Sequence, residues 1–198
     1  MKILLVVPEY GKDSVGAAAI HSQAAAETLS RDHTVEIATT TAVSALRPAH
    51  YAPGVQEEGG LRVHRFALTR SDVHGEPTLS APGLLEFLHG EGRGYGLVIF
   101  YECEAASTAL GLPIVPERAA LIPMLGAAAA LDARPFRTLF QMPRAIGFLS
   151  EAERAQVNGE FHVEHIPYEA LPAPSREDGT PTDEFAEPLE RLAALAIS

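Results

Sequence analysis

The sequence has a single cysteine, few basic residues and no long apolar run, and each shortage excludes a class of protein. Cys103 stands alone, so the chain forms no internal disulfide and no multi-cysteine zinc or iron–sulfur site. The 15 Lys and Arg residues face 26 Asp and Glu, and the net charge of −11 opposes binding to nucleic acid or to an anionic membrane. No apolar run reaches the roughly 18 residues of a membrane span, and the apolar start lacks the small-residue cleavage site of a signal peptide. We therefore expect an acidic cytoplasmic protein without a metal, a cofactor or a nucleic-acid partner.

The composition that remains is typical of a globular protein. The chain has 198 residues, of which 46% are hydrophobic and 21% charged, and this length fits one domain or two small ones. A chain of this length buries roughly 70% of the surface that its unfolded form exposes, so its core needs no covalent cross-links.

Strand-like and helical segments alternate along most of the chain. Residues 2–7 form a continuous apolar run ended by Pro8, as in a strand buried on both faces of a parallel sheet. The Ala-rich residues 16–30 favour a helix, and the β-branched residues 34–39 favour a second strand. Together they predict a βαβ unit with a right-handed crossover. We expect further strands at 61–68, 97–101, 119–123, 145–149 and 162–166, further helices at 84–89, 102–110, 135–141 and 150–158, and a long loop at 40–60.

The last thirty residues change in character. Residues 167–183 are rich in proline and read as an extended linker, and residues 183–197 resume a helical pattern that Pro188 interrupts. One apolar stripe runs along this helix, made by Phe185, Leu189, Leu192 and Leu195. We therefore predict an α/β fold with a doubly wound, mostly parallel, Rossmann-like sheet over residues 1–168, followed by a linker and helix over 169–198.

In such a sheet, ligands bind beyond the carboxyl ends of the strands. Gly16 and Ala17 follow the first strand and open a helix, and free N–H groups at that point suit an anion. Alternatively, Gly16 only lets the helix begin close to the sheet. The segment is neither G-x-G-x-x-G nor a P-loop, which argues against a tight dinucleotide or triphosphate site.

Three further residues are candidates for this edge of the sheet. His21 lies in the first helix, where it either points into a ligand cleft or is a partly exposed helical residue. Tyr101 and Glu102 follow the 97–101 strand. Glu102 and Glu104 share a face only if that strand extends through them. Otherwise they are carboxylates at a solvated helix start.

Other reactive side chains do not form a recognisable site. Cys103 lies between two acids, so we expect a raised thiol pKa and no nucleophile. His162 and His165 would fall on opposite faces of a strand, which disfavours a shared metal. The sequence contains no G-x-S-x-G, and we assign no catalytic residue.

The order of these segments resembles the N-terminal domain of GT-B glycosyltransferases, most closely the retaining family 4 type. The apolar start 1–8, Gly16 and His21 match the family's opening strand, Gly-rich loop and helix with a histidine. Residues 29–37, 61–65, 95–99 and 143–154 match further parts of the family pattern, so the resemblance covers about residues 1–168. The opening loop has fewer glycines than the family's, and residues 123–131 form an apolar stretch where relatives carry a polar loop.

The resemblance implies that this chain is the acceptor-side half of an enzyme that moves a sugar from a nucleotide donor to a hydroxyl acceptor. Gly16, Ala17, His21, Tyr101 and Glu102 would bind the carbohydrate or hydroxyl acceptor. The donor would bind through a C-terminal domain that is missing from these residues, so we expect the chain alone to be inactive. The alternative is a non-catalytic α/β binding module derived from a glycosyltransferase, which associates with itself or a partner chain through Leu189, Leu192 and Leu195. A small α/β enzyme with an unrelated substrate is disfavoured because no nucleophile–base pair is present.

Overall fold

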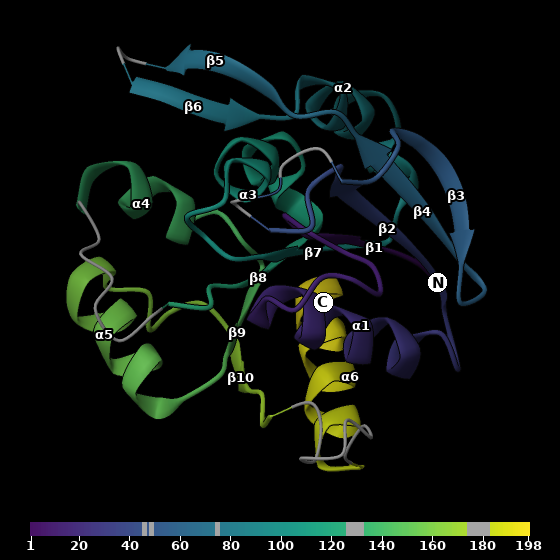
Figure 1. The fold of residues 1–198 in the computed structure, drawn as a ribbon. Coiled ribbons are helices and arrows are strands. Elements are labelled where there is room, and N and C mark those ends of the chain that lie inside the picture. Colours follow the sequence, from purple (N-terminus) through teal and green to yellow (C-terminus); the bar gives the residue numbers. More distant parts are fainter. Residues whose placement is uncertain (45–46, 48–49, 74–75, 126–132, 174–182) are drawn as a thin grey trace.

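A computed structural model describes the chain except residues 45–46, 48–49, 74–75, 126–132 and 174–182. The described residues form an eight-stranded sheet and a separate two-stranded hairpin (Figure 1). The strand order of the large sheet is β10-β9-β8-β7-β1-β2-β4-β3. Its strands are β1 (Lys2–Val6), β2 (Thr34–Thr40), β3 (Gly54–Glu58), β4 (Leu61–Phe66), β7 (Leu97–Tyr101), β8 (Ala119–Ile122), β9 (Ala145–Phe148) and β10 (Tyr168–Ala170), and the hairpin pairs β5 (Thr69–Val73) with β6 (Glu76–Ser80).

The large sheet is doubly wound, as the sequence predicts. From β1 the chain moves one way through β2 to β4, and then returns to β7 on the other side of β1 and continues to β10. Within this sheet, adjacent strands from β10 through β4 pair in parallel. The edge strand β3 is the exception, because it pairs antiparallel with β4. The strand order therefore reverses between β1 and β7, which is where open α/β sheets bind ligands.

Helices cover both faces of the sheet (Figure 1). Ile3 and Leu5 of β1 pack on the face covered by α1 and α6, while Leu4 and Val6 pack on the opposite face. This double burial explains why β1 is apolar at every position after Lys2. The helices are α1 (Ala17–Leu29), α2 (Pro82–Glu91), α3 (Ala106–Gly111), α4 (Ala133–Phe140), α5 (Glu151–Phe161) and α6 (Asp183–Ile197), with short 3-10 turns η1 (Gly92–Gly94), η2 (Leu112–Ile114) and η3 (Pro116–Arg118). Among the described residues, no helix is long and apolar enough to cross a bilayer.

Two sequence predictions at the sheet edges are wrong. The expected loop at 40–60 contains β3, which Gly59 and Gly60 join to β4 through a tight turn with positive φ at both glycines. The expected strand at 162–166 does not form, because His162 takes a left-handed conformation that ends α5. The last strand is instead β10, which pairs with β9.

The apolar stripe of α6 packs on the chain's own sheet. Phe185, Leu189 and Leu192 are completely buried in the same core cluster as β1 and α1. The prediction that this stripe docks a partner chain is therefore wrong for Leu189 and Leu192, because the sheet already covers them. The linker before α6 lies largely outside the described residues.

Candidate functional site

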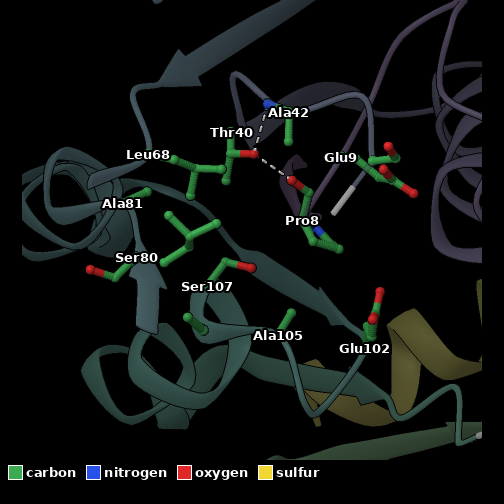
Figure 2. A pocket seen from close by; sticks show the side chains of 13 residues that line it. Pro8, Glu9, Thr40, Ala42, Leu68, Ser80, Ala81, Glu102, Ala105 and Ser107 are labelled. Atoms are coloured by element: carbon green, nitrogen blue, oxygen red, sulfur yellow. Dashed lines mark hydrogen bonds between the residues drawn. The ribbon is translucent and has the colours of Figure 1, made fainter. Parts of the chain in front are cut away.

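A cavity of about 290 Å³ lies where the strand order reverses (Figure 2). We call it the switch-point cavity. Its walls come from the carboxyl ends of β1, β2 and β7 and from the segments beside β6 and α3. The lining residues are Pro8, Glu9, Thr40, Ala42, Ser44, Leu68, Leu79, Ser80, Ala81, Glu102, Ala105, Ala106 and Ser107.

Two carboxylates lie at one end of this cavity (Figure 2). Glu9 follows β1, and Glu102 follows β7. Glu102 has a left-handed backbone with φ 62°, and its N–H donates to the Ile122 carbonyl at 3.0 Å. A non-glycine residue in this conformation costs of order 1 kcal/mol, and such strain is concentrated at functional sites. The helix predicted from residue 102 therefore begins only at Ala106, after a turn that contains Glu102.

Both carboxyl groups hold protons more tightly than usual. Burial, followed by the charge of Glu102, raises the pKa of Glu9. Burial, followed by the charge of Glu104, raises the pKa of Glu102. None of the ion pairs among the described residues involves Glu9 or Glu102. The cavity therefore presents two hydrogen-bond acceptors that a ligand with hydroxyl or cationic groups would satisfy.

Four hydroxyl residues also line the cavity, namely Thr40, Ser44, Ser80 and Ser107, and two of them are informative. Thr40 Oγ1 donates to the Pro8 carbonyl at 2.7 Å and accepts from the Ala42 N–H at 3.1 Å, so it holds the loops after β1 and β2 together (Figure 2). Ser107 Oγ is buried and has no hydrogen-bond partner among the described residues. A buried hydroxyl without a partner is unfavourable, so Ser107 favours a bound polar group or water in this cavity.

Gly16 lies against the Glu9 carboxylate. A Cβ atom added to Gly16 would lie 1.9 Å from Glu9 Oε1, so only glycine leaves this carboxylate its place. Gly16 is also the N-cap residue of α1, without a side-chain cap. A negative charge is favourable at the amino end of a helix, and here the Glu9 carboxylate supplies that charge. A phosphate bound at Gly16 would therefore be repelled by Glu9.

A second cavity, of about 330 Å³, lies at the same edge of the sheet on the side of β8, β9 and β10. We call it the His21 cavity. Among the described residues its lining is almost wholly apolar, and His21 is the only ionisable one of them. The lining residues are Ala17, Ile20, His21, Met124, Leu149, Leu171, Pro172 and Ala173.

The five residues predicted from the sequence divide between these two places. Glu102 lines the switch-point cavity, and Gly16 shapes it by leaving room for the Glu9 carboxylate. Ala17 and His21 line the His21 cavity, while Tyr101 is completely buried, with its ring 5.6 Å from that of His21. The reading of His21 as a partly exposed residue is wrong, because its side chain is only 2% exposed.

Sequence reasoning did not assign Glu9 or Ser107 to the site. Glu9 had a usable signal, since it is the first ionisable residue after the first strand. Ser107 had none, because its burial beside the cavity depends on where α3 begins.

Two expectations about reactive groups can be compared with the structure. Burial, reinforced by nearby glutamates, raises the pKa of the Cys103 thiol to about 12, which confirms that it is not an activated nucleophile. Within the described part of the chain, no group of three or more His, Cys, Asp or Glu residues could hold a metal ion. Of the apolar stretch predicted at 123–131, the residues from 126 onward lie outside the described part of the chain.

Comparisons with known proteins add little. No protein-family model matches the chain, and no curated protein sequence matches it. Solved structures do match, among them a Deinococcus radiodurans multi-domain protein described as structurally similar to chelatases, with two additional novel domains. At 14% identity and a TM-score of 0.25, the alignment covers 99% of this chain and 55% of that one. The chain thus spans about half the length of that protein, and a TM-score this low carries no argument about function.

Proposed function

We propose that this chain is the acceptor-side domain of a GT-B-type glycosyltransferase, and that it binds the hydroxyl-bearing acceptor in the switch-point cavity. The observation that carries the proposal is the pair of half-buried carboxylates, Glu9 and Glu102, at the point where the strand order reverses. The resemblance of residues 1–168 to the N-terminal domain of these enzymes supports the same assignment.

The charge of the cavity favours an acceptor over a nucleotide donor. Glu9 and Glu102 accept hydrogen bonds from sugar hydroxyls, and Ser107 adds a hydroxyl that can donate or accept. The same carboxylates repel a diphosphate, so a nucleotide-sugar needs a different, positively charged site. In this proposal that site belongs to a second domain, which is why we expect no turnover from residues 1–198 alone.

Exposed apolar residues at this edge favour a covering partner. Val15, just before α1, is 77% exposed, and Ile20 on α1 is 46% exposed. Ile20 lines the His21 cavity and not the switch-point cavity, and in this proposal the second domain covers both side chains.

The proposal assigns two of the five predicted binding residues, Gly16 and Glu102, to the switch-point cavity. The other three belong to the side of the His21 cavity: Ala17 and His21 line it, and Tyr101 packs against His21.

The proposal is tested by titrating the chain with neutral methyl glycosides and comparing two carboxylate variants. We expect Glu102→Gln to weaken glycoside binding about tenfold or more, because hydrogen bonds to charged groups contribute about 1.5–3 kcal/mol. Glu104→Gln is the matched control, since Glu104 is exposed and does not line the cavity. Chemical-shift changes in two-dimensional NMR spectra report both the affinity and the residues involved.

Two results would contradict the acceptor-side proposal. Equal loss in the Glu102 and Glu104 variants would assign the effect to overall charge, and sugar transfer at ordinary enzyme rates by this chain alone would contradict an acceptor-side half. Glycoside binding that is not followed by sugar transfer, even when a donor domain and a nucleotide-sugar are supplied, would favour the alternative, a non-catalytic carbohydrate-binding module.

A further inference from the structure

The His21 cavity has walls that are held in place without a ligand. Met124, Leu149 and Leu171 come directly after β8, β9 and β10, so they meet at one edge of the sheet. The Glu153 carboxylate, only 5% exposed, accepts from the Leu125 N–H at 2.7 Å and from the Leu149 N–H at 2.8 Å. One buried side chain thus fixes the loops after β8 and β9 together, and the cavity between them is preformed.

His21 is the feature of this cavity that the fold leaves unexplained. Both of its ring nitrogens are buried, and neither has a hydrogen-bond partner among the described residues. Its neighbours are aromatic, with the Phe185 ring edge-on at 4.9 Å and the Tyr101 ring tilted at 5.6 Å. Leaving buried polar nitrogens unpaired is unfavourable, and native proteins seldom do so without a ligand or an ordered water.

The ring is neutral at physiological pH. Burial lowers the pKa of His21 to about 4, so the imidazole offers one N–H donor and one acceptor but no charge. The other described lining residues are apolar apart from their backbone groups. Against these described walls a sugar would leave most of its hydroxyls unpaired, and an anion would meet no positive charge.

We propose that the His21 cavity binds an uncharged apolar molecule that carries one hydrogen-bonding group, of the phenol class, and that the His21 ring turns so that one of its buried nitrogens pairs with that group. The volume of about 330 Å³ lies within the range of small-molecule sites and exceeds the roughly 150 Å³ that holds a benzene ring. This site is separate from the switch-point cavity, since the described linings of the two have no residue in common.

The test compares phenol with toluene, which has the same shape but no hydroxyl. Each is titrated into the chain, and the ring nitrogens of His21 are followed by ¹⁵N NMR. We expect saturable shifts with phenol, and about tenfold weaker binding of toluene, because a hydrogen bond to the imidazole is worth roughly that factor. His21→Phe keeps an aromatic ring and removes both nitrogens, so it should lose the preference for phenol while still binding toluene.

A second variant keeps the test independent of any change at His21. Ala17 is an exposed residue on the cavity wall, and Ala17→Phe should fill the mouth and abolish binding of both probes with an unchanged circular dichroism spectrum. The proposal is overturned if phenol gives no saturable His21 shift, as for a ring satisfied by water alone, or if phenol and toluene bind equally. It is also overturned if Ala17→Phe binds phenol like the wild type. Glu102→Gln should leave phenol binding unchanged, so failure here and failure of the acceptor proposal are distinguishable.

Discussion

His21 shows how one residue couples burial to the pH dependence of stability. Its pKa is 6.5 when unperturbed and about 4 in the folded chain, because burial disfavours the charged ring. Above pH 6.5 the ring is neutral in both states and adds no pH dependence. Between pH 6.5 and 4 the unfolded chain binds a proton that the folded chain does not, so stability falls as the pH falls.

We therefore expect His21→Phe to remove part of the acid sensitivity of the fold. Relative to this variant, the wild type should lose up to about 3 kcal/mol of unfolding free energy between pH 7.5 and pH 4. Urea unfolding at several pH values measures the unfolding free energy of each protein, and the difference between the two values cancels the titration of the other groups. A constant difference across this range would show that His21 is not buried as a neutral ring.

At the scale of elements, Glu153 joins two loops that the sheet alone leaves apart. It lies in the first turn of α5, where Ser150 Oγ accepts from the Glu153 N–H at 3.1 Å, and its own carboxylate accepts from Leu125 and Leu149. Burial raises the pKa of Glu153 although these backbone N–H groups oppose the rise. The carboxylate is thus a structural acceptor for otherwise unpaired amides.

Removal of this acceptor should loosen both loops. We expect Glu153→Ala to cost at least about 2 kcal/mol, because two buried N–H groups lose their partner. The amide protons of Leu125 and Leu149 should also exchange faster with solvent. Glu151→Ala is the matched control in the same helical turn. Its ion pair with Arg154 is on the surface, so its cost should stay below about 1 kcal/mol. If Glu153→Ala and Glu151→Ala lowered the unfolding free energy equally, and if amide exchange at Leu125 and Leu149 did not change, Glu153 would not be what holds the loops.

At the scale of the whole molecule, the C-terminal helix completes the core. Leu192 on α6 packs so close to β9 that a Cβ added to Gly147 would lie 2.9 Å from Leu192 Cδ2. His33, just before β2, also pairs with Glu190 at 3.1 Å. Residues at opposite ends of the sequence therefore stabilise one another, and α6 is part of the same core as β1.

Truncation of this contact should destabilise the entire chain. We expect Leu192→Ala to cost about 2–5 kcal/mol, the range for a buried leucine that leaves a cavity. Ile197→Ala on the same helix should change stability by less than about 0.5 kcal/mol, because Ile197 is 52% exposed. Denaturant unfolding measures both. If Leu192→Ala lowered the unfolding free energy by less than this range, α6 would pack loosely and residues 169–198 would not be part of the core.

The predictable part of this fold is the part with local signals. The unbroken apolar runs of β1 and β7 and the Ala-rich α1 were predicted within one or two residues. β3 was missed because its residues are exposed or half-buried and carry no apolar alternation. The start of α3 was placed too early, because the left-handed conformation of Glu102 is not a propensity of glutamate but is held by the contact with β8. The same limit applies to the site: position after a strand indicated Glu102, while the burial of Ser107 had no local signal.

By itself, the sequence determined the class of fold and the edge of the sheet where ligands would bind. Apolar runs, helix-forming segments and their order are local properties, and few sheet topologies are compatible with them. Only the tertiary structure decided which residues share a cavity. Glu9 meets Glu102 because β1 and β7 are neighbours, and His21 loses its water because α6, more than 160 residues later, places Phe185 against its ring. Burial and pairing are properties of contacts between distant segments, and the chemistry of both cavities depends on them.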